Sequence, residues 1–141
     1  MTRQPICLDS SALIDFAAPN EPVASLIEPL LVTPDIPVVI STISLAELVT
    51  RPARLGDFAR VQALHAALLR LPGLTLVPFD ADHALEAAAV RAQTNLPLPD
   101  AAIIATARRA NASALIGNDH KWRTRHLGVT YHLVDDILAL P

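Results

Sequence analysis

The chain has 141 residues, the length of one domain with little room for a second. Hydrophobic residues make up 52% of it and charged residues 18%, which excludes a disordered chain, a disulfide scaffold and a coiled coil. The formal net charge of -3 excludes the global basic field that many nucleic-acid-binding proteins carry. We therefore expect residues 1–141 to form a single globular domain.

In chain order, short apolar runs alternate with longer segments of helical character. We expect a strand at 6–8, helices at 10–18 and 21–31, a strand at 37–41, helices at 42–51 and 56–71, a strand at 74–79, helices at 80–93 and 99–111, strands at 113–117 and 129–134, and a helical turn at 135–140. Alternating strands and helices imply right-handed crossovers. The predicted fold is an α/β three-layer α/β/α sandwich with a mainly parallel central sheet of about five strands.

Capping residues and prolines bear on several of these boundaries. Ser10 or Ser11 is expected to cap the first helix, and Asp80 the helix at 80–93. Pro99 suits the first turn of its helix, because the missing N–H is not needed there. Pro29 is expected to limit or kink the second helix.

Membrane contact and export are not expected. The mean hydropathy of +0.38 is high, yet no apolar run approaches the roughly 20 residues of a membrane span. The start of the chain lacks the apolar segment of a signal peptide, and the single cysteine, Cys7, has no disulfide partner. These features predict a cytoplasmic protein. The high apolar content of a small domain also predicts an exposed apolar patch. Because such patches usually mark an interface, we expect an oligomer or a complex.

Four acids stand beside apolar elements: Asp9, Glu47, Asp100 and Asp119. Each has a structural explanation by itself, since Asp9 and Asp100 suit helix starts. Ser44 and Glu47 likewise fit a capping box. Together they indicate more, because a parallel sheet brings strand ends and helix starts to one edge. Carboxylates that converge there repel one another, and such a cluster persists only if a cation neutralises it.

An all-oxygen site without paired cysteine or histidine ligands suits Mg²⁺ or Mn²⁺ rather than zinc. Such ions favour phosphoryl chemistry, because they activate a water molecule and neutralise the leaving oxygen. The sequence therefore predicts a metal-dependent enzyme that acts on phosphate esters.

The segments LDSSALID, SLAELV and LPDAAIIATARRANASALIGND, in this order and context, resemble a PIN domain, and more narrowly the VapC-type toxins of bacterial toxin–antitoxin pairs. The resemblance spans nearly the whole chain. It implies a three-layer fold and a Mg²⁺- or Mn²⁺-dependent endoribonuclease. It also implies a homodimer, and an antitoxin that fills the active-site groove.

Residue by residue, the resemblance gives catalytic roles to Asp9, Glu47, Asp100 and Asp119. It makes Asp9, Asp100 and Asp119 the expected metal ligands. Ser10 resembles the Thr or Ser that usually follows the first acid, and Asn118 resembles the asparagine of the family's T-N-D signature. Both are expected to support the metal site.

Two residues, a glycine and a tryptophan, depart from the family pattern. Gly117 stands where the family usually has Thr or Ser, so we expect a weaker metal site that Gly117→Thr would strengthen. Trp122 lies near a position where the family often has Phe, and it is interpreted as a core anchor rather than a platform for base stacking.

The basic residues are concentrated locally. Residues 108–126 hold five basic residues and one acid, and residues 51–60 hold three arginines and one acid. We expect the first group to contact the phosphates of an RNA substrate without reading its sequence, and the second group to be the next candidate. The predicted RNA-binding residues are Arg108, Lys121, Arg123 and Arg125.

Two other enzyme classes fit poorly. A haloacid-dehalogenase-like phosphatase needs a second Asp two positions after the first, where this chain has Ser11. A dinucleotide-binding fold needs a glycine-rich loop after the first strand, and none of the 4 glycines lies there. One alternative stays open: a catalytically weak PIN-like module that keeps its partner-binding surface, as Gly117 would permit.

Overall fold

The computed structural model describes residues 3–17, 21–32 and 35–138. Its central sheet has five strands: β1 (Ile6–Leu8), β2 (Val38–Ser41), β3 (Leu74–Val77), β4 (Ala114–Gly117) and β5 (Tyr131–Leu133). The strand order is β3-β2-β1-β4-β5, and every pairing is parallel. The predicted α/β fold is confirmed, with a sheet that is wholly parallel.

The helices fall where the sequence predicts them: α1 (Ser10–Ala17), α2 (Glu21–Val32), α3 (Thr42–Arg54), α4 (Phe58–Leu69), α5 (Ala81–Thr94), α6 (Leu98–Arg109) and α7 (Val134–Leu138). A short 3₁₀ helix, η1 (His120–Trp122), lies in the basic loop after β4, where no element was predicted. The predicted helix positions 18 and 139–140 lie outside the described residues. No described helix is both long and apolar enough to cross a membrane.

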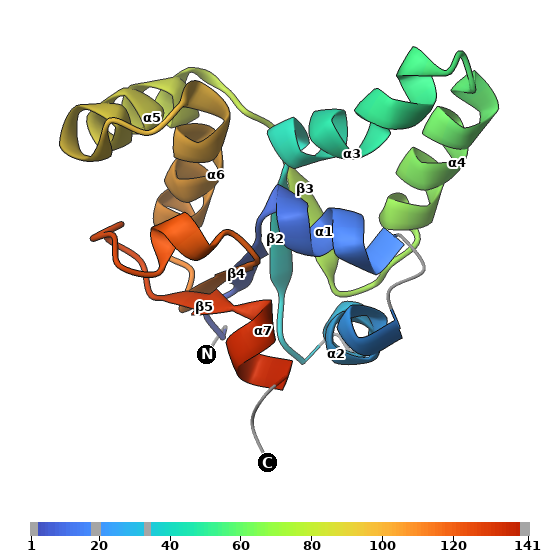
Figure 1. Ribbon diagram of the computed structural model, residues 1–141, viewed down its shortest axis with the longest axis horizontal. Coiled ribbons are helices and arrows are strands. Elements are labelled where there is room, and N and C mark those ends of the chain that lie inside the picture. The colour runs from blue at the N-terminus through green and yellow to red at the C-terminus, as the bar shows by residue number, and fades with distance from the viewer. Residues whose placement is uncertain (1–2, 18–20, 33–34, 139–141) are drawn as a thin grey trace.

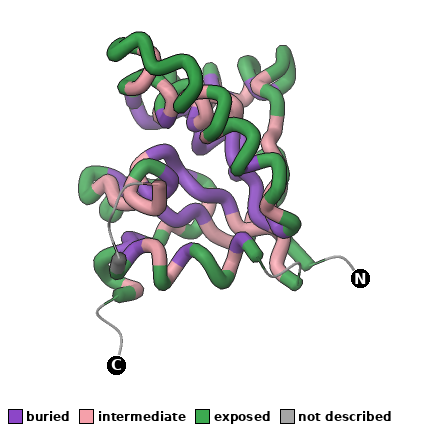
Figure 2. Tube along the Cα trace, turned by 90° about the vertical axis from the view of Figure 1, so that its right-hand side faces the viewer, coloured by how far each residue is buried: buried purple, intermediate pink, exposed green. Residues whose placement is uncertain are grey.

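The sheet separates two hydrophobic cores, because successive residues of a strand point to opposite faces. Cys7 of β1 and Leu115 of β4 share one core with α5 and α6. Leu8 and Ile116, the next residue of each strand, share the other core with α1 to α4 and α7. Helices therefore lie on both sides of the sheet (Figure 1), and the buried part of the chain runs through the middle of the molecule (Figure 2).

Two boundary predictions need correction. The cap of α1 is Asp9, whose Oδ1 accepts the Ala12 N–H at 3.0 Å, and not Ser10 or Ser11. A carboxylate one residue before the helix reaches this amide more directly than a serine inside the first turn. Pro29 does not limit α2, which continues to Val32, and the alternative of a kink at Pro29 stays a prediction. The apolar face that α2 packs into the core offsets the hydrogen bond lost at this proline.

The order of the strands fixes where a ligand site can form. The chain passes from β1 to β2 and β3 on one side, and β4 and β5 lie on the other side of β1. The carboxyl ends of β1 and β4 therefore meet at the point where the winding reverses, the usual place for a ligand in an open parallel sheet. Two arms flank this point, one formed by α3 and α4 and the other by α5 and α6 (Figure 1).

Candidate active site

The four acids singled out in the sequence line one cavity of about 180 Å³. Asp9 follows β1, and its N–H donates to the Ile116 carbonyl at 2.9 Å, which keeps the ends of β1 and β4 together. Asp119 follows β4 by two residues. Glu47 comes from α3 and Asp100 from the first turn of α6. The crossovers of the sheet thus bring acids far apart in the sequence to one edge.

Asp9 is the most buried of these acids, with 2% of its surface exposed. Burial raises the pKa of its carboxyl to about 6, and the charge of Asp119 adds to the rise. Hydrogen bonds act in the other direction: the Ser11 hydroxyl donates to Asp9 Oδ1 at 2.6 Å, beside the Ala12 N–H. The ionised carboxylate is therefore held in place at an electrostatic cost that a cation would remove.

Asp100 lies in the first turn of α6, but it makes no capping hydrogen bond, and the N-cap position is Pro97. Asp100 is therefore not a cap, but its place in the first turn complements the helix dipole, as the sequence predicts. Burial raises the pKa of the Asp100 carboxyl, and the charges of Asp119 and Glu47 raise it further. The negative charges of the cavity act on one another, as a shared cation site requires.

Asp119 combines a structural role with its place in the cavity. Its carboxylate accepts the Lys121 N–H at 2.9 Å and so caps η1. The Tyr131 hydroxyl accepts the Asp119 N–H at 3.0 Å and donates to the Asp119 carbonyl at 3.2 Å. Burial raises the pKa of this phenol, so it stays protonated and able to donate. The backbone that carries Asp119 is thereby fixed from β5.

Glu47 is held by the Ser10 hydroxyl and does not form a capping box. The cap of α3 is Ser41, whose hydroxyl accepts the Ile43 N–H at 3.1 Å, so Ser44 lies within the helix instead of before it. The Ser10 hydroxyl donates to Glu47 Oε1 at 2.6 Å and lies 3.0 Å from the Ser44 hydroxyl. Ser10 therefore supports the acid of α3 and not the neighbouring Asp9.

Ser11 is a member of this site that the sequence did not single out. Its hydroxyl donates to Asp9 Oδ1 and accepts the Asn118 N–H at 2.8 Å. Asn118 contributes its side chain elsewhere, since its Nδ2 donates to Asp15 Oδ2 at 3.2 Å. The LDSS motif contained the signal, but two adjacent serines at a helix start look alike in sequence until the first turn is oriented.

Gly117 has a steric role that was not expected. A Cβ built on this residue would overlap the carboxylate of Asp9, with Oδ1 only 2.6 Å away. The expectation that Gly117→Thr would strengthen the site meets a steric obstacle, because the added side chain would need the space that Asp9 fills and Asp9 would have to move. The hydroxyl beside this carboxylate comes from Ser11 of α1 instead.

The donor set fits a hard divalent cation, because carboxylate oxygens are the ligands that Mg²⁺ and Mn²⁺ prefer. Within residues 3–17, 21–32 and 35–138, no three acids, histidines or cysteines form a ready metal-binding group. The acids line a common cavity all the same, and rotation of exposed carboxylates is the movement that would bring their oxygens onto one ion.

The predicted RNA-binding residues divide into two kinds. Arg108 pairs with Glu86 at 2.8 Å, and Arg123 pairs with Asp136 at 3.3 Å. Arg108 also lies eight residues after Asp100 on α6, about 12 Å along the helix axis. Arg108 is thus a structural ion-pair partner at the far end of α6, and the structure does not bring it to the cavity.

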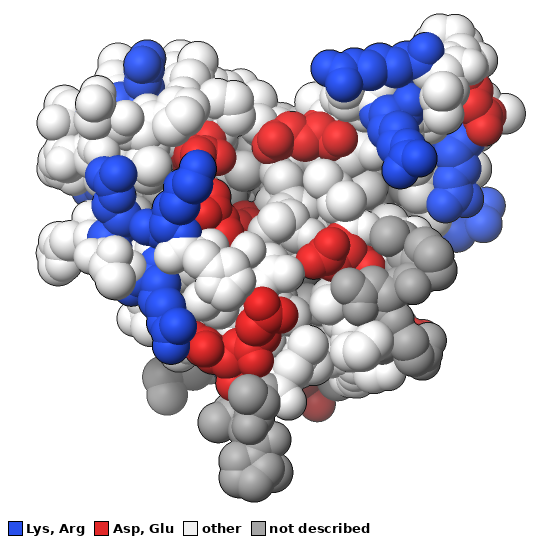
Figure 3. All heavy atoms as spheres, in the orientation of Figure 1, with Lys and Arg blue, Asp and Glu red and all other residues white. Residues whose placement is uncertain are grey.

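Lys121 and Arg125 keep their charge available. In the described parts of the chain neither makes an ion pair, although Arg125 donates to the Thr94 carbonyl at 2.6 Å. The charge of Lys121 lowers the pKa of Asp100, so this ammonium lies near the cavity. Figure 3 shows acidic side chains in the middle of this face, where the surface is hollowed between the arms, with Lys and Arg on either side.

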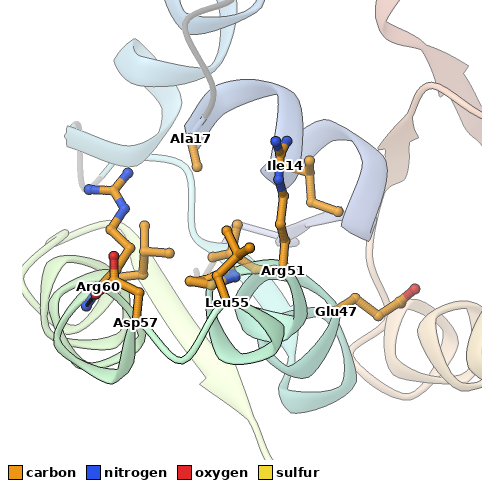
Figure 4. A pocket seen from close by; sticks show the side chains of 10 residues that line it. Ile14, Ala17, Glu47, Arg51, Leu55, Asp57 and Arg60 are labelled. Atoms are coloured by element: carbon orange, nitrogen blue, oxygen red, sulfur yellow. Dashed lines mark hydrogen bonds between the residues drawn. The ribbon is translucent and has the colours of Figure 1, made fainter.

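A larger apolar groove of about 450 Å³ continues from the acidic cavity, because Ile14 and Glu47 line both. Its walls come from α1, α3 and α4, and they include Leu55, which is 76% exposed. Arg51 and Arg60 also line the groove, and Figure 4 shows Glu47 directed away from Arg60, toward the other end. The groove is therefore apolar along its walls, with Glu47 at one end and both Arg60 and Asp57 at the other.

A family model described as PIN domain matches residues 6–125. Among solved structures, FitAcB from Neisseria gonorrhoeae is 25% identical, with a TM-score of 0.68, over 89% of this chain and 95% of that chain. VapBC2 from Rickettsia felis, bound to a DNA fragment from their promoter, is 18% identical, with a TM-score of 0.72, over 91% and 97%. VapC20 from Mycobacterium tuberculosis, a sarcin-ricin loop cleaving toxin, is 18% identical, with a TM-score of 0.66, over 83% and 92%. Comparison with curated proteins finds no match.

Proposed function

Because the chain belongs to the PIN domain family, we propose that it is a Mg²⁺- or Mn²⁺-dependent endoribonuclease and the toxin of a toxin–antitoxin pair. The observation that carries this proposal is the cavity at the carboxyl ends of β1 and β4, where four acids from distant parts of the chain meet. The fold of the solved toxins supports it, since one of them is described as a toxin that cleaves the sarcin-ricin loop.

In this proposal Asp9, Asp100 and Asp119 hold the cation. When bound, the ion supplies a water molecule of lowered pKa and neutralises charge on the phosphate. Glu47 completes the acidic wall, and Ser10 keeps its carboxylate directed along the cavity through the 2.6 Å hydrogen bond. Asn118 supports the site through its backbone, because its N–H fixes the Ser11 hydroxyl next to Asp9.

We propose that single-stranded or looped RNA lies in the hollow between the two arms. Lys121 and Arg125 of the loop after β4, and Arg51 and Arg60 of the groove, would contact phosphates beside the acids. Figure 3 shows Lys and Arg side chains on either side of the acidic hollow. Arg54 is the remaining cation of the α3–α4 arm. Such contacts hold a backbone in register and carry no base information. The acids alone would repel RNA, so the flanking cations are needed for binding.

The proposed partner is a cognate antitoxin that fills the groove beside the cavity. An amphipathic segment would place apolar side chains against Leu55 and its neighbours, and a basic side chain at the acidic end. Such a segment would cover the RNA path and occupy the place of the cation. Exposed leucines on the opposite arm, Leu85 and Leu98, are where we propose that a second copy packs to form a homodimer.

The proposal is tested by incubating the purified protein with a pool of cellular RNA and mapping the new ends. Cleavage with Mg²⁺ or Mn²⁺, and none in EDTA, is the expected result. Partner binding without any metal-dependent cleavage would instead identify the chain as a PIN-like binding module.

A further inference from the structure

The carboxylate of Asp9 fills the space in which any other residue at position 117 would carry its Cβ. All three of the nearest atoms to that Cβ position belong to this one carboxylate group. The acid at the end of β1 therefore lies directly over the last residue of β4. This close approach is possible only because residue 117 has no side chain.

The orientation of Asp9 over Gly117 is held by the Ala12 N–H and by one hydroxyl group, that of Ser11. Ser11 lies in the first turn of α1, and its O–H donates to Asp9 Oδ1 at 2.6 Å. The Ser11 hydroxyl oxygen also accepts the Asn118 N–H, at 2.8 Å. A serine hydroxyl has one proton and two lone pairs, so both contacts are satisfied with their roles unambiguous. Ser11 thus joins the acid of β1 to the backbone that leaves β4.

The segment after β4 is held from two sides. The Ser11 hydroxyl holds the amide of Asn118, and the Tyr131 hydroxyl holds both backbone groups of Asp119. Because Ser11 also holds Asp9, its oxygen sets where the carboxylate of Asp9 lies relative to the backbone of Asp119. Loss of that oxygen leaves the buried carboxylate with one side-chain partner fewer and frees the amide of Asn118.

We propose that Ser11 is a positioning residue of the acidic cavity and that Gly117 is its steric counterpart. Ser11 acts through Asp9, by directing its carboxylate over Gly117 and fixing its separation from Asp119. The role of this arrangement, to prepare Asp9 for a divalent cation, rests on the proposed function. The dependence of the Asp9 carboxylate on Ser11 and Gly117 is a matter of geometry and can be tested without measuring cleavage.

The steric half is tested by a double-mutant cycle on stability, measured by thermal unfolding in EDTA. Gly117→Ala should lower the midpoint by several degrees in the wild-type background, since its methyl group displaces the Asp9 carboxylate. In an Asp9→Ala background the same substitution should cost much less, because the overlapping atoms are gone. An equal loss in both backgrounds would overturn the steric claim.

The hydroxyl half is tested by Mn²⁺ affinity, measured by calorimetric titration of the metal alone. Ser11→Ala should weaken Mn²⁺ binding about tenfold, as losses in the support of metal ligands usually do, and Ser11→Thr should restore most of it. Ser113→Ala, an exposed serine whose hydroxyl lies 3.4 Å from the Pro5 carbonyl, is the matched control and should bind as wild type does. Equal affinity of the wild type and Ser11→Ala would overturn the positioning role.

The stability cycle and the Mn²⁺ titration distinguish a failure of this inference from a failure of the proposed function. A protein that cleaves no RNA and binds no Mn²⁺ in any form would end the proposed function, and the stability cycle would still decide whether Asp9 depends on Gly117. A fully active Ser11→Ala with wild-type Mn²⁺ affinity would leave the nuclease intact and remove Ser11 from its support. Where Gly117→Ala does not fold, Ser11→Ala, which removes one oxygen, gives the deciding result.

Discussion

The hydroxyl of Ser10 donates a 2.6 Å hydrogen bond to Glu47 Oε1, and this contact joins the start of α1 to the middle of α3. Adjacent serines therefore serve different acids, because Ser11 donates to Asp9. The helix rotation of about 100° between neighbouring residues sends the two hydroxyls in different directions. One first turn thus supports acids that come from two separate parts of the fold.

Ser10→Ala should release Glu47 and lower stability by about 1.5–3 kcal/mol, the range for hydrogen bonds to charged groups. Urea unfolding measures this loss, with Ser113→Ala as the control for a serine outside the site. RNA cleavage should fall in Ser10→Ala, because Glu47 is no longer directed along the cavity. Unchanged stability together with unchanged cleavage would show that this contact is incidental.

The buried carboxyl of Asp9 predicts a specific pH dependence of the metal-free protein. Its pKa is about 6 in the folded chain, above its ordinary value of 3.8. A raised pKa means that stability is fully present below the ordinary value and is lost as the pH rises through about 6. Ionised Asp9 should therefore cost on the order of 3 kcal/mol at neutral pH.

Asp9→Asn removes this titration and keeps an oxygen that accepts from Ser11. In EDTA, the variant should gain stability relative to the wild type as the pH rises from acidic to neutral. Urea unfolding over a pH series measures the difference. Two parallel stability curves would contradict the unfavourable placement of the Asp9 charge.

The sequence predicts that the four acids converge, but it does not predict which side chains hydrogen-bond to each acid. Strand ends and helix starts are read from apolar periodicity, and the rules of parallel sheets then bring Asp9, Asp100 and Asp119 to one edge. The partner of each hydroxyl depends on how α1 is rotated against β4 and α3, which local sequence does not encode. For the same reason Ser44 and Glu47 looked like a capping box, although Ser41 caps α3.

Glycine at position 117 shows a second limit of sequence reasoning. The residue was interpreted as a missing hydroxyl, because sequence comparison asks which side chain should stand at a position. The structure has the acid of a neighbouring strand in that space. Only the structure reveals that the Asp9 carboxylate occupies the space of a side chain at position 117.

Divalent cations should stabilise the wild type by binding the folded state only. Mn²⁺ should raise the thermal midpoint, and the shift should shrink in Asp9→Asn and in Asp100→Asn because each removes a charged ligand. Asp80→Asn is the matched control, since this exposed aspartate caps α5 and lies outside the cavity. The same Mn²⁺ shift in all four proteins would indicate ion effects unrelated to the cavity.

Binding of RNA should depend on salt through the cations that have no acidic partner. For single strands the slope of log affinity against log salt is about 0.7 per phosphate neutralised. Replacing Lys121 and Arg125 by Gln should flatten this slope. Arg108→Gln should leave the slope unchanged and lower stability, because Glu86 loses its partner. If the slope changed only in Arg108→Gln, then Arg108, and not Lys121 and Arg125, would be the residue that contacts the RNA phosphates.

The groove predicts where an antitoxin segment binds. Leu55→Asp puts a charge on its apolar wall and should weaken the complex with the product of an adjacent reading frame by about tenfold or more. Since Leu55 is 76% exposed, folding should be unaffected. Leu69→Asp, at a leucine of α4 that is 65% exposed and does not line the groove, is the matched control. Equal weakening by both variants would place the partner elsewhere.

The most direct test of the account compares RNA cleavage by the wild type and by Asp100→Asn, with Mn²⁺ and in EDTA. Asp100 makes no capping hydrogen bond, so its substitution changes the cavity without removing a helix cap. The account predicts metal-dependent cleavage by the wild type, none in EDTA, and a loss of orders of magnitude in a variant that remains folded. Full cleavage by Asp100→Asn, or by the wild type in EDTA, would contradict it.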